Sequence, residues 1–88
     1  MITVEAILEN PSGFHLRPAQ LFVEKANQFK SLITVKNDKG MGVAGKSILG
    51  LMTLGLTRGA KIIIEANGED EEAAVKELLD LVKSKFGE

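Results

Sequence analysis

The order of strand-like and helix-like segments constrains the fold of this chain more than any other feature of its sequence. Four short stretches have strand character, most clearly the first, where apolar and polar residues alternate as they do in a half-buried strand. The predicted strands cover Ile2–Leu8, Leu32–Lys36, Met41–Ala44 and Ala60–Ala66. The predicted helices cover Pro18–Ala26, Ser47–Met52 and a segment that starts near Asp70.

The order β-α-β-β-α-β-α indicates an α+β fold. An antiparallel sheet with helices on one face buries these apolar stripes most simply, and 88 residues suffice for a single domain over 1–88. Asn37–Gly40 is expected to form a hairpin turn between the second and third strands. Asp70 is expected to cap the last helix, with Lys83 and Lys85 near its end. The apolar stripe of that helix is predicted to contain Val75, Leu78, Leu79, Val82 and Phe86.

Composition excludes several classes of function. Eleven basic and 12 acidic residues give a net charge of −1, which argues against a protein that covers nucleic acid or an anionic membrane. The absence of cysteine excludes a disulfide framework and a thiolate metal site. The first residues lack a basic segment and include Glu5, so we expect no secretory signal, no membrane span and a cytoplasmic location.

His15 is the only histidine, and it lies between a turn at Ser12-Gly13 and a helix that begins near Arg17-Pro18. Backbone N–H groups at a helix start lack intrahelical partners, and the helix dipole is positive there, so a phosphate dianion is stabilised. The same field disfavours the imidazolium form, which predicts a neutral, nucleophilic imidazole. Arg17 can pair with phosphate oxygens. From these residues alone, the alternative is that His15 is a solvent-exposed loop histidine with no role. A metal site is not indicated, because the sequence has no second histidine and no cluster of carboxylates near His15.

Three segments resemble, in order, three segments of one known family, and the resemblance extends over the whole chain. Gly13–Ala19 (GFHLRPA) resembles an active-site signature, Lys46–Gly55 (KSILGLMTLG) a regulatory segment, and Gly68–Ala74 (GEDEEAA) the entry into a final helix. The family is HPr, the histidine-containing phosphocarrier of the bacterial phosphoenolpyruvate-dependent phosphotransferase system (PTS). The resemblance implies an open-faced β-sandwich with four antiparallel strands and three helices on one face.

The resemblance also implies roles for His15, Leu16 and Arg17 of the first segment and for the neighbouring Ser12. His15 would accept a phosphoryl group from enzyme I on ring nitrogen Nδ1 and pass it to a sugar-specific enzyme IIA domain. Arg17 would be the charge partner, the backbone N–H groups of Leu16 and Arg17 would hold the phosphate, and Ser12 would add its hydroxyl. Leu16 departs from the small residue usual after the histidine. The implied protein is a monomeric phosphoryl carrier rather than a stand-alone catalyst, with no cofactor and no metal.

The second segment implies regulation and docking. Ser47 is expected to cap the short helix, and it matches the serine that HPr kinase/phosphorylase modifies in Gram-positive members of the family. Such members also bind a catabolite-control transcription factor. The short helix is apolar nearly all round, so some of its side chains must remain exposed. The resemblance implies that Leu49 and Met52, with part of Ile48, form a docking patch beside His15, bordered by Arg17, Gln20 and Lys46, which suits brief, weak association.

The segment Gly40–Ser47 (GMGVAGKS) satisfies the G-x-x-x-x-G-K-S pattern of a nucleotide-binding loop. Such a loop must follow a parallel strand and open into a helix within a larger sheet, whereas here a hairpin turn precedes it and only about 40 residues follow. We therefore interpret the segment as the third strand and its connection to the short helix, with a nucleotide-binding enzyme as the alternative.

Two further alternatives lie closer to the family. The hairpin from Lys36 to Lys46 is about one residue longer than in sugar-system HPr, which resembles the nitrogen-related branch, whereas Lys46–Gly55 resembles the sugar branch. We favour the sugar branch. The other alternative is an HPr-like regulatory adaptor that controls carbon metabolism, with Ser47 as its switch.

Overall fold

The computed structural model describes residues 1–88 and contains four strands and three α-helices in the predicted order. The strands are β1 (Ile2–Ile7), β2 (Leu32–Lys36), β3 (Gly42–Ala44) and β4 (Lys61–Asn67). The helices are α1 (Leu16–Ala26), α2 (Ile48–Thr53) and α3 (Glu71–Lys83), and a 3₁₀ turn, η1 (Lys85–Gly87), follows α3. None of these helices has the length and apolar character needed to cross a bilayer.

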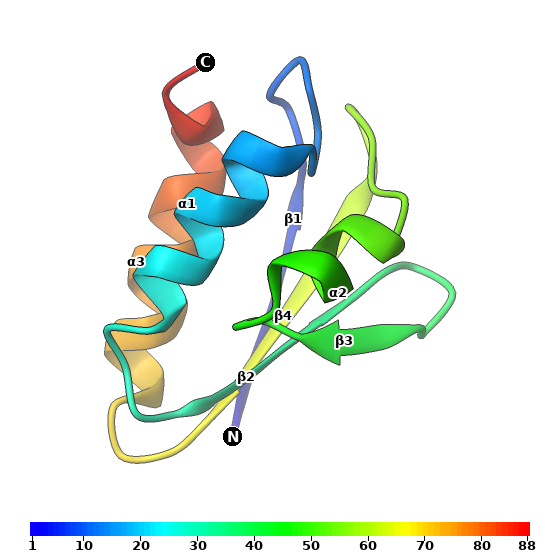
Figure 1. Cartoon of the computed structure of the whole chain (residues 1–88). Coiled ribbons are helices and arrows are strands. Elements are labelled where there is room, and N and C mark those ends of the chain that lie inside the picture. Colours follow the sequence, from blue (N-terminus) through cyan, green and yellow to red (C-terminus); the bar gives the residue numbers. More distant parts are fainter.

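The four strands form one antiparallel sheet in the order β1-β4-β2-β3. The first and last strands of the sequence are therefore neighbours, and β4 lies between β1 and β2. The helices lie on one side of this sheet, with α1 and α3 side by side and α2 next to α1 (Figure 1). The predicted α+β fold, with an open-faced sheet, is confirmed.

The alternation of buried and exposed residues along the strands shows which face of the sheet the helices cover. Ile62, Ile64 and Ala66 of β4 are fully buried beneath the helices. In β1 the partly buried residues alternate with exposed ones, and the exposed set includes Glu5. On the open face, Lys61 pairs with Glu5 at 2.9 Å and Lys36 of β2 pairs with Glu65 at 3.0 Å, so charged side chains cover part of this surface.

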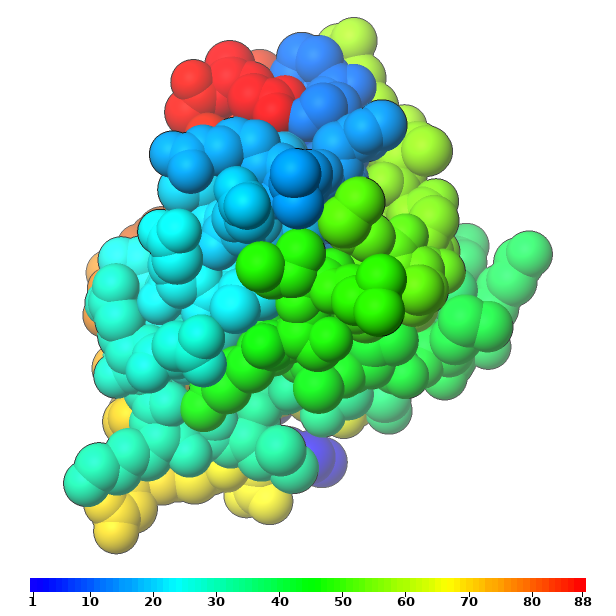
Figure 2. Space-filling model, viewed as in Figure 1, coloured from blue at the N-terminus to red at the C-terminus, as the bar shows by residue number.

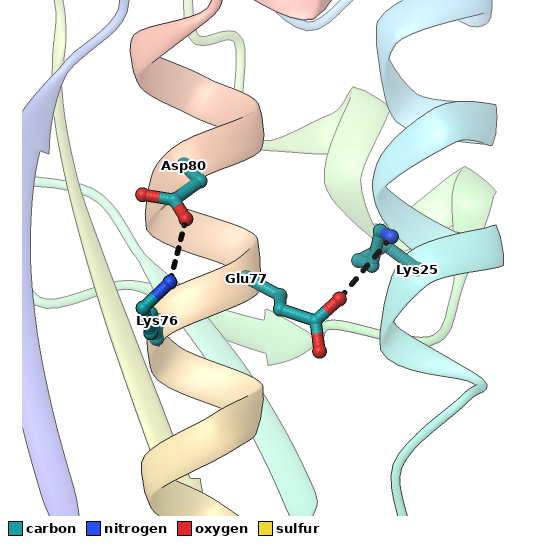
Figure 3. Close-up of polar contacts among 4 residues, drawn as sticks. All are labelled: Lys25, Lys76, Glu77 and Asp80. Atoms are coloured by element: carbon teal, nitrogen blue, oxygen red, sulfur yellow. Dashed lines mark hydrogen bonds and ion pairs between the residues drawn. The ribbon is translucent and has the colours of Figure 1, made fainter.

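The first helix follows its predicted apolar stripe. Ala19, Phe22, Val23 and Ala26 are buried, and Pro18 lies in the first turn as expected. An ion pair between Lys25 and Glu77 joins α1 to α3, with Nζ and Oε1 3.4 Å apart, while Lys76 and Asp80 pair within α3 at 3.3 Å (Figure 3). These ion pairs are solvent-exposed, so burial of the apolar stripes contributes more to the association of the two helices.

The short helix α2 also matches the prediction. Ser47 is its N-cap, and its hydroxyl oxygen accepts a hydrogen bond from the N–H of Gly50 at 3.0 Å. Leu51 and Leu54 are buried in the core, whereas Ile48 is only partly buried. A six-residue helix thus places part of its apolar surface in the core and leaves the rest in solvent.

The expected capping role of Asp70 is wrong. Asp70 stands at the N-cap position of α3, but its side chain makes no bond to that helix. Instead its carboxylate accepts hydrogen bonds from the N–H groups of Lys30 and Ser31, at 2.8 and 3.0 Å, and from the Ser31 hydroxyl. The loop between α1 and β2 presents these donors directly to the carboxylate, so Asp70 joins two loops that are 39 residues apart in sequence.

The prediction that Phe86 belongs to the apolar stripe of the last helix is also wrong. The helix stops at Lys83, so Lys85 and Phe86 lie beyond it with left-handed backbone angles, φ 59° and 54°. The reason is packing: the turn moves the Phe86 ring against that of Phe14, with centroids 5.7 Å apart, and leaves Phe86 only 6% exposed. If the helix continued, the Phe86 ring would instead lie in line with the apolar stripe of α3.

Loss of the Asp70 contacts is expected to destabilise the fold in a pH-dependent way. The hydrogen bond from the Ser31 hydroxyl, and then that from the Lys30 N–H, hold the pKa of Asp70 below its usual range. A carboxyl whose pKa is lowered on folding stabilises the protein at pH values above its unfolded pKa, and this contribution is lost as the pH falls through the folded value. We therefore expect Asp70→Asn to lower Tm at pH 7.

The difference in Tm between wild type and Asp70→Asn should shrink as the pH falls below about 4. Thermal unfolding followed by circular dichroism from pH 7 to pH 2 measures this difference. Asp38→Asn, in the exposed hairpin turn, is the matched control. A Tm difference that stays constant over this range would show that the Asp70 charge does not stabilise the fold.

Candidate functional site

His15 is the N-cap residue of α1. Its backbone is extended, with φ −76° and ψ −175°, and its carbonyl oxygen accepts the first intrahelical hydrogen bond, from the N–H of Ala19 at 3.0 Å. The His15 side chain is solvent-exposed and makes no capping hydrogen bond. The imidazole is therefore accessible to a partner molecule.

Two backbone donors lie next to this imidazole. The N–H groups of Leu16 and Arg17 precede the first intrahelical bond of α1, so neither has an acceptor within the helix. The following residue, Pro18, has no N–H group. Both donors lie at the positive end of the helix dipole, and the Arg17 side chain is exposed there. This end of α1 can bind a small anion through two amides and a guanidinium group.

The turn before His15 is fixed by a close backbone contact. Gly13 has φ +61°, and a Cβ atom at this position would lie 2.6 Å from the carbonyl oxygen of Leu56 and 2.8 Å from the Cα atom of Thr57. The N–H of Phe14 donates to the same Leu56 carbonyl at 3.0 Å. Only glycine fits this position, for both backbone and steric reasons.

A small aromatic cluster fixes the same turn from inside. The Phe14 ring is 4% exposed and meets Phe22 of α1 edge to face, with centroids 5.5 Å apart and an interplanar angle of 75°. It also contacts Phe86 of η1. His15 therefore follows a residue whose side chain is buried between two helical segments, which limits its movement relative to the core.

Ser12 is bonded to a carboxylate from the other end of the sequence. Its N–H donates to Oε1 of Glu88 at 3.1 Å, and its hydroxyl donates to Oε2 of the same side chain. Buried Asn10 holds this turn, because its side-chain amide donates to the carbonyl oxygen of Gly13 at 2.8 Å and lies 3.4 Å from Glu88. The hydrogen bond from the Ser12 hydroxyl is the main cause that lowers the pKa of Glu88, and the charge of His15 adds to it.

His15 and α2 share a shallow hollow. It has a volume of about 160 Å³ and is lined by Phe14, His15, Met52, Gly55, Leu56 and Thr57. Exposed apolar side chains lie on α1 and α2: Leu16 of α1 is 53% exposed, and Leu49 and Met52 of α2 are 75% and 41% exposed. We call these three residues the apolar patch. In the space-filling view, α2 lies directly against the first half of α1 (Figure 2).

The remaining residues of the predicted docking surface have different environments. Gln20 is half-buried on α1, and Ile48 is partly buried against the core. The ammonium group of Lys46 donates to the backbone carbonyl of Phe29 at 2.8 Å, which places it beyond the end of α1 that is opposite to His15. Ser47 is half-buried and uses its hydroxyl oxygen in the cap of α2.

The glycine-rich segment is built into the sheet. It contains β3, which pairs with β2 in an antiparallel hairpin, and its Gly45 lies against β2, where a Cβ atom would be 2.5 Å from the Cγ2 atom of Ile33. The N–H of Gly45 donates to the Ile33 carbonyl at 2.8 Å. This glycine therefore serves a close approach between backbones.

Three residues near His15 were not found by sequence reasoning: Asn10, Phe86 and Glu88. Asn10 begins the turn that follows β1, and an asparagine at the start of a turn is a signal for side-chain bonds to the backbone. Phe86 was assigned to a helical stripe. Glu88 meets Ser12 from 76 positions away, and no local pattern marks this contact.

The site is that of a small α+β protein with an exposed histidine at a helix start, a buried turn before it and an apolar patch beside it. Comparison with known proteins identifies the family. Residues 2–84 match the family model described as "PTS HPr component phosphorylation site". The chain is 48% identical over 84 residues to the phosphocarrier protein HPr of Borreliella burgdorferi, and the alignment covers 96% of each chain.

Solved structures agree. The crystal structure of HPr-C-His from Thermoanaerobacter tengcongensis matches with a TM-score of 0.95 at 46% identity, over 100% of this chain and 98% of that one. The catabolite-repression protein Crh of Bacillus subtilis, described as a dimer with a swapping domain, matches with a TM-score of 0.76 at 37% identity, over 96% and 95% of the two chains. This chain belongs to the HPr family, which includes the phosphocarriers of the PTS, and PTS proteins are the partners that this family implies.

Substitution of Gly13 is expected to destabilise the protein. In Gly13→Ala the new methyl group would collide with the backbone of Leu56 and Thr57, and the left-handed backbone would add strain, so we expect a loss of about 1–3 kcal/mol in the free energy of unfolding. Urea denaturation measures the change. Gly55→Ala is the matched control, because Gly55 has φ +65° with no neighbouring atom within 4 Å of a Cβ. Equal losses in both variants would show that the contact with residues 56 and 57 does not fix the turn.

Proposed function

We propose that this protein carries a phosphoryl group on Nδ1 of His15, which it takes from phospho-enzyme I and gives to an enzyme IIA domain. The observation that carries the proposal is the place of His15: an exposed imidazole at the N-terminus of α1, next to the N–H groups of Leu16 and Arg17, which lack intrahelical acceptors. Membership of the HPr family supports the same role. We place the protein in the sugar branch of the PTS and in the cytoplasm.

The proposed transfer needs few groups. The lone pair of Nδ1 attacks phosphorus, the N–P bond to the donor histidine breaks as the new N–P bond forms, and the group that moves is PO₃⁻. The proton on Nε2 stays in place. The N–H groups of Leu16 and Arg17 and the Arg17 guanidinium stabilise the negative charge of the oxygens, and Ser12 offers its own N–H and hydroxyl. The protein is a substrate and donor in this reaction rather than a stand-alone catalyst.

The apolar patch fits brief encounters with more than one partner. Leu16, Leu49 and Met52 are exposed around the hollow that contains His15, and a flexible methionine adapts to different surfaces. Gln20 and Ile48 lie on the same two helices. An association of this kind buries little area and dissociates quickly, as a carrier that shuttles between donor and acceptor requires.

Incubation with enzyme I, Mg²⁺ and phosphoenolpyruvate, followed by intact mass measurement, tests the proposal. We expect the wild type to gain the mass of one phosphate, which mild acid treatment removes again, and His15→Ala to gain none. In Arg17→Ala we expect a phosphorylation rate about tenfold lower, because a charge-assisted contact is removed. Arg58→Ala, in the exposed turn before β4, is the matched control and should react at the wild-type rate. Wild-type protein that gains no phosphate, or a variant at residue 15 that still does, would contradict the proposal.

A second function is favoured by the position of Ser47. This residue begins the helix that carries Leu49 and Met52, so a phosphate on its hydroxyl would place negative charge on the docking surface. We propose that Ser47 is a regulatory phosphorylation site for HPr kinase/phosphorylase, and that it controls binding to enzyme I and to a catabolite-control transcription factor.

The charge-mimicking variant Ser47→Asp tests this second function. We expect it to bind enzyme I at least several-fold more weakly than wild type, measured by isothermal titration, because the added charge lies beside the apolar patch. Thr53→Asp, in the last turn of the same helix, is the control for charge on α2 as such. Equal affinity of wild type and Ser47→Asp for enzyme I would count against a switch at this position.

A further inference from the structure

We propose that the side-chain carboxylate of Glu88 is an internal substitute for the phosphoryl group: it binds the Ser12 donors while His15 is unmodified and leaves them when His15 is phosphorylated. This inference rests on the proposed function, because it assigns Ser12 to the phosphoryl site. It adds a residue that sets how strongly the carrier holds its phosphoryl group.

The first argument is the convergence of donors on one carboxylate. The N–H and the hydroxyl of Ser12 both donate to Glu88, one to each carboxylate oxygen, and the side-chain amide of Asn10 lies 3.4 Å from Oε1. Donors that converge in this way form a binding site for an anion. In the unmodified protein the anion is already supplied by the chain itself.

The second argument is electrostatic. The Glu88 carboxylate is held by Ser12, three positions before His15 in the turn that leads into α1. A phosphoryl group on the His15 imidazole carries about two negative charges at neutral pH and more acceptor oxygens than a carboxylate. Two anions that share the same donors repel each other, and the dianion on His15 is expected to displace the singly charged carboxylate.

The third argument is that the chain permits this movement. Phe86 is buried against Phe14 and stays with the core, whereas Glu88 itself is exposed. Gly87 separates them, with φ +77° and open space around the position of a Cβ atom. Rotation about the backbone of Gly87 can therefore withdraw the carboxylate without disturbing the aromatic cluster.

The consequence is a competition that favours release. Phosphorylation must break the bonds between Ser12 and Glu88, and dephosphorylation restores them. The Glu88 carboxylate therefore lowers the stability of the phosphorylated form relative to the free form, which favours donation to the next protein.

The experiment measures the equilibrium of phosphoryl transfer in the intact chain. Each protein (wild type, Glu88→Gln or Glu69→Gln) is incubated with enzyme I, phosphoenolpyruvate and excess pyruvate until its phosphorylated fraction is constant. Mass spectrometry measures this fraction. We expect the ratio of phosphorylated to free protein to be about two- to fivefold higher in Glu88→Gln, as for the loss of an exposed charge interaction. Glu69→Gln, an exposed glutamate before α3, is the matched control and should equal wild type.

A second measurement uses the wild-type protein alone, so it does not depend on how a variant folds. Carbon-detected NMR at constant neutral pH compares the signals of the Glu88 side-chain carboxyl and the Ser12 amide before and after phosphorylation. We expect the Glu88 carboxyl signal to move to that of an exposed glutamate such as Glu69 once His15 carries phosphate, because the hydrogen bonds with Ser12 are then broken. A purely structural role for Glu88 would leave its carboxyl signal in place.

The outcomes separate the two proposals. Phosphorylation of His15 with equal ratios in wild type, Glu88→Gln and Glu69→Gln, or with an unchanged Glu88 carboxyl signal, overturns the role of Glu88 and leaves the carrier function in place. Failure of the wild type to accept phosphate overturns the carrier function, and the role of Glu88 with it. A raised ratio in Glu88→Gln alone, together with the altered carboxyl signal, supports both.

Discussion

The close approach of Gly13 to the backbone of Leu56 and Thr57 is the contact on which the rest of this site depends. It brings the turn before α1 against the turn after α2, two segments that are far apart in the sequence. Because the Phe14 N–H bonds to the Leu56 carbonyl at this same point, the chain enters α1 in one direction only. His15 therefore begins the helix with its side chain outside the core and beside the hollow that it shares with Met52.

The site separates what holds the histidine from what reacts with it. The positioning groups are buried or belong to the backbone: Phe14, Asn10 and the glycine turn. The groups available to a phosphate are exposed and belong to the first turn of α1, where amides lack intrahelical acceptors. This division suits the proposed phosphoryl transfer, since the charged groups can change partners while the core remains packed.

Local patterns in the sequence were sufficient for the fold and for the location of His15. Three predicted features depend on residues within a few positions of one another, and all three are found: the alternation of apolar and polar residues in the strands, the Ser47 cap and the Asn37–Gly40 turn. The errors concern contacts between distant segments. Asp70 bonds to the loop at Lys30 rather than to its own helix, and Phe86 leaves the helix to reach Phe14. Sequence periodicity carries no information about which distant donor or ring a side chain will meet.

Leu16 has a backbone that serves the anion site and a side chain that serves the surface. Its amide lies in the first turn of α1, and its side chain is 53% exposed, outside the packed interior. Exchange of this side chain alters the shape that a visiting protein meets, but it leaves the amide and the imidazole where they are. Under the proposed function, position 16 can therefore tune which surfaces the protein fits without moving the groups that take part in the transfer.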